Sequence, residues 1–377
     1  MSGLYIHIPF CAKRCIYCDF YSNTNLQRRD SYVSALIREM ELRSVADPIR
    51  TIYFGGGTPS LLTATQFRRL FDAIDKNFDA NSIETTIEAN PDDLTSAYVD
   101  SLRLLPFNRI SIGVQSFDDD DLNFLKRRHS AQDAINAVNR CRDAGFDNIS
   151  IDLIYGLPGQ TPKRWLRNLE QAIALDLPHL SAYNLSYEEG TALYKIKEQG
   201  GLQLIDDEAN EILYNIQRDE LTKAGYIHYE ISNFAKPTPE HPQGLVSQHN
   251  TSYWNGTHYI GLGASAHSYN GLTRSWNIAS LEDYIQSLEK EQLPAEIEHL
   301  DERMRYNDHL ITRLRTMQGV SISELRASFG DVRTSRFLAK TEALKYRKLL
   351  KMQGDNVKVS AENWFLSDMV MREMIDL

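Results

Sequence analysis

Three of the four cysteines in this chain, Cys11, Cys15 and Cys18, lie within eight residues of one another. One short loop therefore carries three thiols, and clustered thiolates in a protein kept under reducing conditions bind metal rather than pair as disulfides. Two kinds of centre fit this spacing. One is a tetrahedral zinc site completed by His7. The other is a [4Fe-4S] cluster held by three thiolates, which leaves one iron free to bind a small molecule.

A glycine-rich turn, Gly55-Gly56-Gly57-Thr58-Pro59, follows the next apolar run of the sequence. Glycines after a strand let the backbone approach a ligand closely, although a bare tight turn would explain them equally well. The remaining cysteine, Cys141, lies among small apolar residues of a helical pattern, which predicts a core position. The ligand-binding interpretation of the glycine turn is favoured because the turn follows the next predicted strand after the cysteine loop.

Length and composition exclude several classes of protein. The 377 residues leave room for one large domain and a smaller one, and 42% hydrophobic with 24% charged residues is ordinary for a globular protein. No apolar run reaches the roughly 20 residues that would cross a bilayer, and the start lacks a signal-peptide pattern, so we expect a cytoplasmic protein. The net charge of −10 argues against a protein that coats nucleic acid, and no nucleic-acid partner is expected.

Six short apolar runs alternate with amphipathic stretches in the first half of the chain, which predicts a parallel α/β sheet. Periodicity alone does not choose between an open doubly wound sheet and a barrel. Polar or metal-binding groups follow or end five consecutive runs, as they do at the carboxyl rim of barrel enzymes. The predicted strands are 4–8, 51–54, 82–88, 109–114, 148–154 and 179–185, and the predicted helices are 30–43, 65–78, 96–104, 131–144 and 162–175.

The second half changes character. A long helix is predicted at 206–224, a proline-rich loop follows at 236–242, and it leads into the sequence His-Asn-Thr-Ser-Tyr-Trp at 249–254. Between residues 303 and 353 there are twelve Lys or Arg and four Asp or Glu, a local excess of +8. Helices at 302–316, 322–328 and 334–350, then a hairpin at 352–360, predict a small winged-helix-like module.

Five motifs in order over the first 190 residues are similar to those of the radical S-adenosylmethionine (SAM) superfamily. The resemblance is to the branch that holds oxygen-independent coproporphyrinogen oxidases and HemW-type heme chaperones. It implies a partial (β/α)6 TIM-like barrel, and the order of elements after it predicts a smaller, mainly helical winged-helix-like C-terminal domain. The expected divisions are a radical SAM domain at 1–235, a connecting region at 236–300 and a basic accessory domain at 301–377. The motifs are LYIHIPFCxxxCxYC from Leu4, YFGGGTP from Tyr53, IEANP from Ile87, SIGVQSF from Ser111 and IDLIYGLP from Ile151.

The resemblance also implies residue roles. Cys11, Cys15 and Cys18 would ligate a [4Fe-4S] cluster whose open iron chelates S-adenosylmethionine. A zwitterion with a ribose needs an anion, a cation and hydrogen-bond acceptors, and the implied side chains supply them. For Arg127 a solvated basic turn is the competing interpretation. By this resemblance Tyr5 lies beside the sulfonium, Gly56, Gly57 and Thr58 meet the amino-acid part, Glu88 pairs with the ammonium, Arg127 with the carboxylate, and Gln115 and Asp152 hold the ribose.

Two features favour the chaperone side of this branch. The oxidase pattern has a fourth cysteine where this chain has Phe20, and oxidases carry a sizeable segment ahead of the cluster motif, whereas Cys11 here follows only ten residues. The HNxxYW signature of HemW-type proteins is present and predicts heme contact through a neutral imidazole and flat aromatic surfaces. The signature residues are His249, Asn250, Tyr253 and Trp254, with His258 and His267 as alternative iron ligands and Arg274 as a partner for a propionate.

The expected function is therefore a heme chaperone that binds heme and transfers it to an unidentified acceptor protein. The competing hypothesis is a radical SAM oxidoreductase acting on a porphyrinogen. A zinc-containing nucleic-acid-binding protein is the weakest reading, because it leaves the glycine turn and the strand-end residues unexplained. The basic module could dock an acidic acceptor or a lipid headgroup, or simply be a solvated face, and a homodimer is compatible with the sequence.

Overall fold

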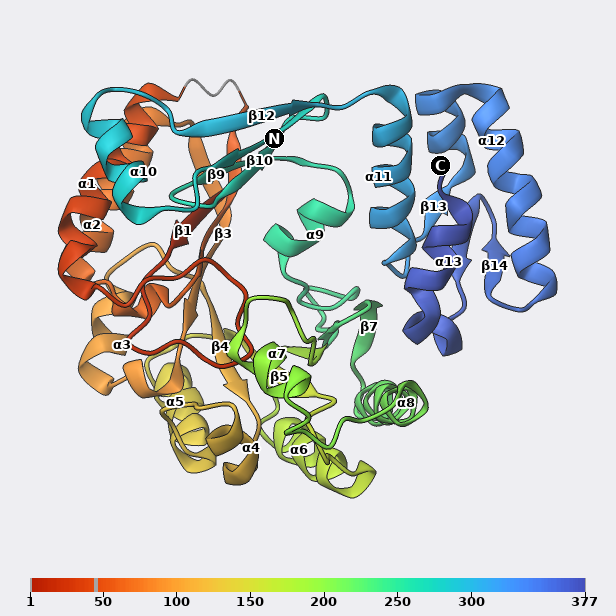
Figure 1. Ribbon diagram of the computed structural model, residues 1–377, viewed down its shortest axis with the longest axis horizontal. Helices are drawn as coiled ribbons and strands as arrows, with labels where there is room; N and C mark the ends of the chain where they lie inside the picture. Colours follow the sequence, from red (N-terminus) through yellow and green to blue (C-terminus); the bar gives the residue numbers. More distant parts are fainter. Residues whose placement is uncertain (1, 44–46, 377) are drawn as a thin grey trace.

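A twelve-stranded sheet forms the body of the protein in the computed structural model, which describes residues 2–43 and 47–376 (Figure 1). Its six central strands are parallel and lie side by side in chain order. All six were predicted from the sequence to within a few residues. They are β1 (Ser2–Ile8), β2 (Ile49–Gly56), β3 (Ala80–Ala89), β4 (Arg109–Gln115), β5 (Asn148–Tyr155) and β6 (His179–Asn184).

Helices connect these parallel strands. Because the strand order never reverses and such crossovers are right-handed, the helices gather on one face of the sheet and all carboxyl ends of the strands reach one rim. Several helices begin at the caps that their sequences supply, such as the capping box of Thr63 and Gln66. The connecting helices are α1 (Arg29–Leu42), α2 (Ala64–Asn77), α3 (Ser96–Arg103), α4 (Asp119–Phe124), α5 (Ala131–Asp143) and α6 (Pro162–Ala174).

Both ends of the sheet are extended by later parts of the chain. Beyond β6, strands β8 (Asn233–Ala235) and β7 (Ile227–Glu230) add in antiparallel fashion after helices α7 (Ala192–Glu198) and α8 (Asp207–Lys223). On the other side β9 (His258–Leu262) pairs parallel to β1. Strands β10 (His267–Tyr269), β11 (Thr273–Asn277) and β12 (Ala295–His299) follow it, with α10 (Leu281–Glu289) lying against α1.

Residues of the region 236–300 therefore complete the main sheet, a contribution that the sequence did not reveal. A separate connecting region at 236–300 stays a prediction. The short helix α9 (Gln248–Trp254), which carries the HNxxYW sequence, lies between this sheet and the C-terminal helices (Figure 1).

The C-terminal part follows the predicted order of elements. Helix α11 (Glu302–Leu314) precedes α12 (Ile322–Tyr346), which is broken at Gly330, where φ is 78°. The break matches the two separate helices predicted there. Strands β13 (Val320–Ser321), β14 (Leu350–Gln353) and β15 (Asn356–Val359) form a small sheet, and α13 (Ser367–Met374), which was not predicted, closes the unit. Its likeness to a winged helix stays a prediction.

Many cations of this C-terminal unit have acidic partners. Arg313 pairs with Glu324 and Arg347 with Glu373, both on the surface. These pairs neutralise only part of the local excess of +8, and exposed pairs of this kind are worth little to stability. In the part of the chain that the structure describes, no helix is long and apolar enough to cross a membrane.

Aromatic packing holds the connecting helix α2 against the sheet. Phe54 on β2 meets Phe67 and Phe71 of α2 and Phe107, with ring centroids 5.3 to 5.5 Å apart in edge-to-face arrangements. Edge-to-face pairs satisfy the ring quadrupoles while burying large apolar surfaces. This cluster fixes the strand that leads into the glycine turn.

We expect Phe54→Ala to lower the free energy of unfolding by about 3–5 kcal/mol, because it leaves a cavity among rings that cannot collapse into it. The matched control is Phe20→Ala, since the Phe20 ring is 62% exposed and should change stability little. Urea denaturation followed by circular dichroism measures both. Equal losses for the two variants would contradict the role of the cluster.

Candidate functional site

The three cysteines lie in the loop after β1, on the rim where the parallel strands end. Cys11 is buried, and Cys15 and Cys18 are partly exposed. Burial raises the pKa of Cys18 to about 11, with the neighbouring thiols adding to the effect, and burial also raises the pKa of Cys11. Metal binding at this loop therefore has to displace protons.

The cysteine loop after β1 is attached to helix α7, which follows β6 at the other end of the parallel strands. The backbone N–H of Leu193 donates to the carbonyl of Ile16 over 2.8 Å, and Ile16 and Tyr17 pack on a small apolar cluster that includes Leu125, Ile154 and Leu193. At the loop's ends, the Cys11 N–H donates to the Asn23 carbonyl. These contacts hold the thiols in place through the protein's own packing.

A chain of hydrogen bonds joins two of the thiols through the ends of β2 and β3 and the segment after α4. The Thr58 hydroxyl lies 3.6 Å from Cys11 Sγ and accepts from Asn90 Nδ2 over 3.2 Å. Asn90 Oδ1 accepts from Arg127 Nη2 over 2.5 Å, and Arg127 Nη1 donates to Cys15 Sγ over 3.4 Å. Asn90 belongs to the IEANP motif, yet its central position was not predicted.

A zinc site completed by His7 does not fit this geometry. The two ring nitrogens of His7 are already used, Nδ1 with the Tyr5 hydroxyl at 3.0 Å and Nε2 with the Tyr21 carbonyl at 2.9 Å. Within residues 2–43 and 47–376, no three His, Cys, Asp or Glu side chains form the close set that a single metal ion needs. A four-iron cluster holds its thiolates further apart and needs no histidine, so three cysteines suit it.

The glycine turn places backbone directly beside the cysteine loop. Gly56 has a φ of 109°, and a Cβ there would lie 2.4 Å from the His7 ring, while a Cβ on Gly57 would lie 2.8 Å from the carbonyl oxygen of Phe10. Only glycine is compatible with both positions. The Gly56 N–H donates to Glu88 Oε2 over 3.0 Å, so the turn also orients this carboxylate.

Two carboxylates, Glu88 on β3 and Asp152 on β5, lie close enough for the charge of one to influence the pKa of the other. Burial raises the pKa of Glu88 to about 7; the hydrogen bond from Tyr53 opposes the shift and the Asp152 carboxylate adds to it. The Tyr53 hydroxyl donates to Glu88 Oε1 over 2.7 Å. Burial raises the pKa of Asp152 as well, with Arg109, itself only 1% exposed, as a compensating cation. A cationic ligand group beside Glu88 would relieve this cost.

Arg127 and Gln115 complete this side of the site. Arg127 donates to the Gly113 carbonyl over 2.7 Å as well as to Asn90, and its Nε is enclosed without a partner. It is not a solvated turn residue; its neighbour Arg128 has that role, pairing with Asp92 and Asp93 at the surface. Gln115, at the end of β4, has a φ of 71°, a strained conformation for this residue type.

These groups fit S-adenosylmethionine in chemical type. The rim offers a carboxylate for an ammonium, a guanidinium with an unused N–H for a carboxylate, and a second carboxylate for ribose hydroxyls. Among the predicted residues, Thr58 and Arg127 contact Cys11 and Cys15 directly, and Gly56, Gly57, Glu88 and Gln115 lie at the ends of β2, β3 and β4. Tyr5 and Asp152 lie further back along β1 and β5.

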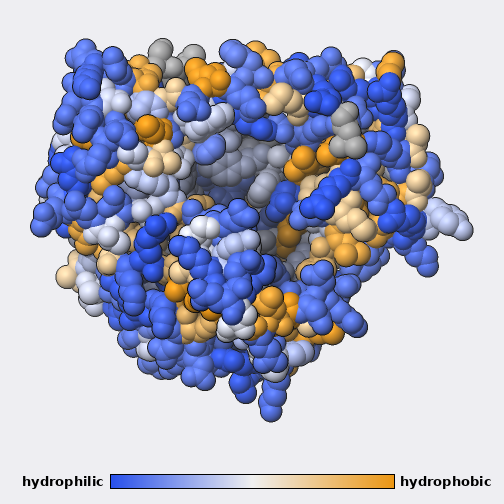
Figure 2. All heavy atoms as spheres, in the orientation of Figure 1, coloured by the Kyte–Doolittle hydropathy of each residue, from blue (hydrophilic) through white to orange (hydrophobic). Residues whose placement is uncertain are grey.

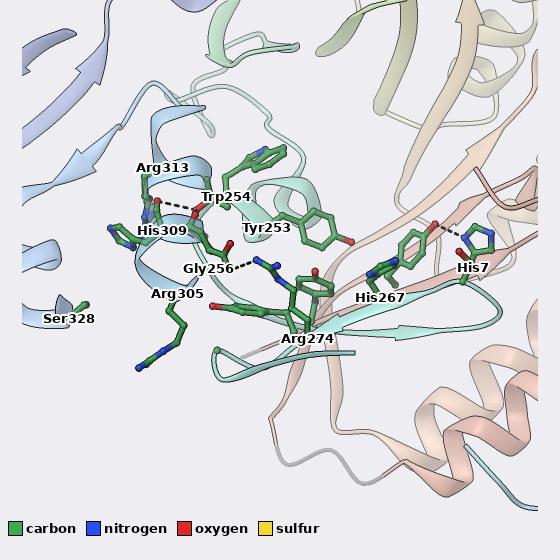
Figure 3. A pocket seen from close by; sticks show the side chains of 18 of the residues that line it. His7, Tyr253, Trp254, Gly256, His267, Arg274, Arg305, His309, Arg313 and Ser328 are labelled. Carbon is green, nitrogen blue, oxygen red and sulfur yellow. Dashed lines mark hydrogen bonds and ion pairs between the residues drawn. The ribbon is translucent and has the colours of Figure 1, made fainter. Parts of the chain in front are cut away.

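A cavity of about 790 Å³ opens next to this rim, between the sheet and the C-terminal helices. Figure 2 shows the molecule hollowed near the centre of this face, and Figure 3 shows the side chains inside. Its volume lies in the range of pockets that hold cofactor-sized ligands. Its lining includes Tyr5, His7, Phe20 and Tyr21 near the cysteine loop, Tyr253 and Trp254 of α9, Tyr259, His267, Tyr269 and Arg274 of the sheet, and Arg305, His309 and Arg313 of α11.

The HNxxYW sequence is divided between the core and this cavity. His249 is fully buried, and its ring nitrogens contact the Thr51 hydroxyl at 2.9 Å and the Tyr253 hydroxyl at 2.8 Å. Tyr253 and Trp254 line the cavity, while Asn250 does not. Glu84 on β3 accepts the His249 N–H over 2.9 Å and so fixes the start of α9 to the sheet.

The alternative heme residues are also separated. His258 pairs with Asp47 and lines a different hollow. His267 lies in the main cavity and is exposed. Arg274 is occupied by Asp308 and lies 3.8 Å from Glu298.

Arg305 and His309, for which no sequence motif predicted a role, also line the cavity. Their spacing of four residues places them on one face of the predicted helix 302–316. This spacing was the signal that could have drawn attention to them.

The parallel strands, the three-cysteine loop and the polar rim define a radical SAM protein, and residues 5–172 match the Radical SAM superfamily. The chain is 37% identical over 337 residues to the heme chaperone HemW of Bacillus subtilis (strain 168), covering 88% of this chain and 87% of that one. It is 33% identical over 382 residues to the heme chaperone HemW of Mycobacterium tuberculosis (strain ATCC 25618 / H37Rv), covering 99% and 94%. Within the superfamily, this chain belongs to the HemW family.

The structure is also similar to that of the coproporphyrinogen III oxidase HemN from Escherichia coli, a radical SAM enzyme. The TM-score is 0.85 at 26% sequence identity, and the match covers 99% of this chain and 90% of the other. The mixed α/β fold with a large, mainly parallel sheet is thus shared with HemN.

Replacing Asn90 by Ala should break the bridge between the two thiols. The change leaves the Arg127 Nη2 group short of a partner, and such losses cost about 1–3 kcal/mol. We expect lower stability and faster loss of iron to a chelator from the anaerobically reconstituted protein. Asn136→Ala is the control, because within the described residues this side chain makes one hydrogen bond, accepted from Gln132 on the surface of α5. Identical iron retention in both variants would refute the bridge.

Affinity for S-adenosylmethionine should rise with pH through about 7 in the wild type. Glu88 is protonated below its pKa of about 7, so the anion that attracts the ligand's ammonium forms only above it. Titration calorimetry from pH 6 to pH 8, compared with Glu88→Gln, isolates this residue from the ligand's own ionisation. A pH profile that is unchanged in Glu88→Gln would show that Glu88 does not meet the charged group.

Proposed function

We propose that this protein is a heme chaperone that binds heme in the 790 Å³ cavity and passes it to an acceptor protein. The observation that carries the proposal is the lining of this cavity, in which aromatic rings, imidazoles and guanidinium groups surround a cofactor-sized space beside the cysteine loop. Flat aromatic surfaces suit a porphyrin, imidazole suits its iron and guanidinium suits its propionates. The HemW relatives carry the name heme chaperone, which agrees.

Phe20 favours this function over porphyrinogen chemistry. It stands where the oxidase pattern has a further cysteine, and its ring is 62% exposed and lines the cavity. An apolar ring at this place adds surface for a porphyrin face. For the propionates we propose Arg305 in place of Arg274, because Arg274 is held by Asp308, whereas Arg305 has no carboxylate partner in the described residues.

In this proposal Cys11, Cys15 and Cys18 hold a [4Fe-4S] cluster, and the polar rim holds S-adenosylmethionine. Together these groups supply one-electron chemistry when bound. The chain's own residues bind and orient these groups. Arg127, which donates to Cys15 Sγ, holds the carboxylate of S-adenosylmethionine, and the Glu88 carboxylate, which the Gly56 N–H orients, holds its ammonium. Tyr5 lies on β1 and lines the heme cavity, so it borders both ligands.

We further propose how the two parts of the molecule are organised and what the C-terminal unit contacts. The six parallel strands form a partial (β/α)6 barrel, and the unit from residue 301 is a winged-helix-like accessory domain. Its basic surface docks an acidic acceptor or a lipid headgroup in the cytoplasm. A homodimer is compatible with this arrangement.

A second candidate function is an oxidoreductase acting on a porphyrinogen. The likeness to HemN over 99% of the chain favours it, because the two proteins share their fold throughout. The same cavity would then hold the substrate rather than heme.

One experiment separates the two functions. The protein is reconstituted anaerobically with iron and sulfide, titrated with heme, and incubated in parallel with coproporphyrinogen III, a reductant and S-adenosylmethionine. We expect stoichiometric heme binding in the absorption spectrum and no porphyrinogen turnover. Efficient formation of protoporphyrinogen would overturn the chaperone assignment in favour of the enzyme.

The metal centre is tested by replacing Cys15 with Ala. The iron–sulfur absorbance should disappear, because two thiolates cannot hold the cluster. Cys141→Ala is the matched control, since this thiol is buried in the core away from the loop and should leave the absorbance intact. Stoichiometric zinc in the natively purified protein would contradict the cluster.

A further inference from the structure

The proposed heme site needs a side chain with a free lone pair that can reach the iron. Most histidines near the cavity have no ring nitrogen available for this. His7 and His249 each contact partners through both ring nitrogens, as described above. Breaking either set would leave buried polar groups unpaired, at a cost of about 1–3 kcal/mol each. These two residues are therefore parts of the supporting structure rather than open ligands.

His309, on the α11 wall, presents a different obstacle. Its Nε2 is enclosed and makes no hydrogen bond, and the ring lies edge-on to Phe329 with centroids 5.6 Å apart. The nitrogen thus faces the interior of the C-terminal unit. His258 lies outside the cavity, where it pairs with Asp47.

His267 is the histidine that meets the requirement. It projects from β10 into the cavity, is exposed, and makes no side-chain hydrogen bond within the described part of the chain (Figure 3). The Trp276 ring on the neighbouring strand lies 6.1 Å away and limits the orientations of the imidazole. Burial and the charge of Arg274 lower the pKa of His267, so the ring is neutral at pH 7 and its lone pair is available.

Resting on the proposed function, we infer that His267 is the axial ligand that holds heme iron against the sheet wall of the cavity. Ligation by this one histidine leaves the second axial position of the iron without a ligand from this chain. An acceptor's ligand can then bind iron before His267 releases it, so that transfer proceeds by exchange of one iron–nitrogen bond for another, with no change in oxidation state. The HNxxYW helix would support the cavity, with Tyr253 and Trp254 as its contact surface.

The inference is tested on the full-length, cluster-reconstituted protein by heme titration with absorption and electron paramagnetic resonance spectra. We expect His267→Ala to weaken heme binding by at least about tenfold and to abolish the signature of histidine ligation. In His267→Gly, added imidazole should restore that signature, because it replaces the missing side chain without altering the fold. His258→Ala is the matched control, because His258 lies outside the cavity, and it should keep the wild-type spectrum.

The outcomes separate this inference from the proposed function. If the wild type binds heme but His267→Ala retains its spectrum and affinity, the ligand assignment is wrong and the chaperone function stands. Loss of the signature in His309→Ala, with His267→Ala unchanged, would place iron on the opposite wall and likewise overturn it. A wild-type protein that binds no heme would end both proposals.

Discussion

The link from Cys11 through Thr58, Asn90 and Arg127 to Cys15 is the constraint on which the rest of the site depends. The cysteine loop has no helical or strand hydrogen bonds of its own, so contacts with neighbouring segments of the chain must fix its shape. Here the neighbours are the ends of β2 and β3 and the segment after α4. The parallel strand order brings these ends to one rim, which is why the link can close.

Charged side chains are also buried along the strands that lead to this rim. Glu88, Asp152 and Arg109 come from three adjacent strands, and burial raises the pKa of both carboxylates. An isolated charge would be too costly there, so the compensating Arg109 is part of the fold as much as of the site. A ligand that carries both an ammonium and a carboxylate would supply the counter-charge that the buried carboxylates do not fully receive from the protein.

The cavity depends on a different element, the short helix α9. It is tied to β3 by Glu84, to β2 by the contact of His249 with Thr51, and to the C-terminal unit by Arg315, whose guanidinium lies 5.1 Å from the Trp254 ring. One wall of the cavity thus belongs to the sheet and the other to α11 and α12. Cavities between two packed units are common ligand sites.

The amino-acid sequence by itself determined the parallel strands, their connecting helices and the positions of the three thiols. These follow from apolar periodicity and from motif spacing, which are local properties of the chain. Only the tertiary structure decided that β9 to β12 join the main sheet, that Asn90 bridges the thiols, and that His249 is enclosed while His267 is open. The reason is physical: a histidine is a ligand or a structural residue according to which groups occupy its ring nitrogens. Those groups come from strands and helices far away in the sequence, so no local pattern records them.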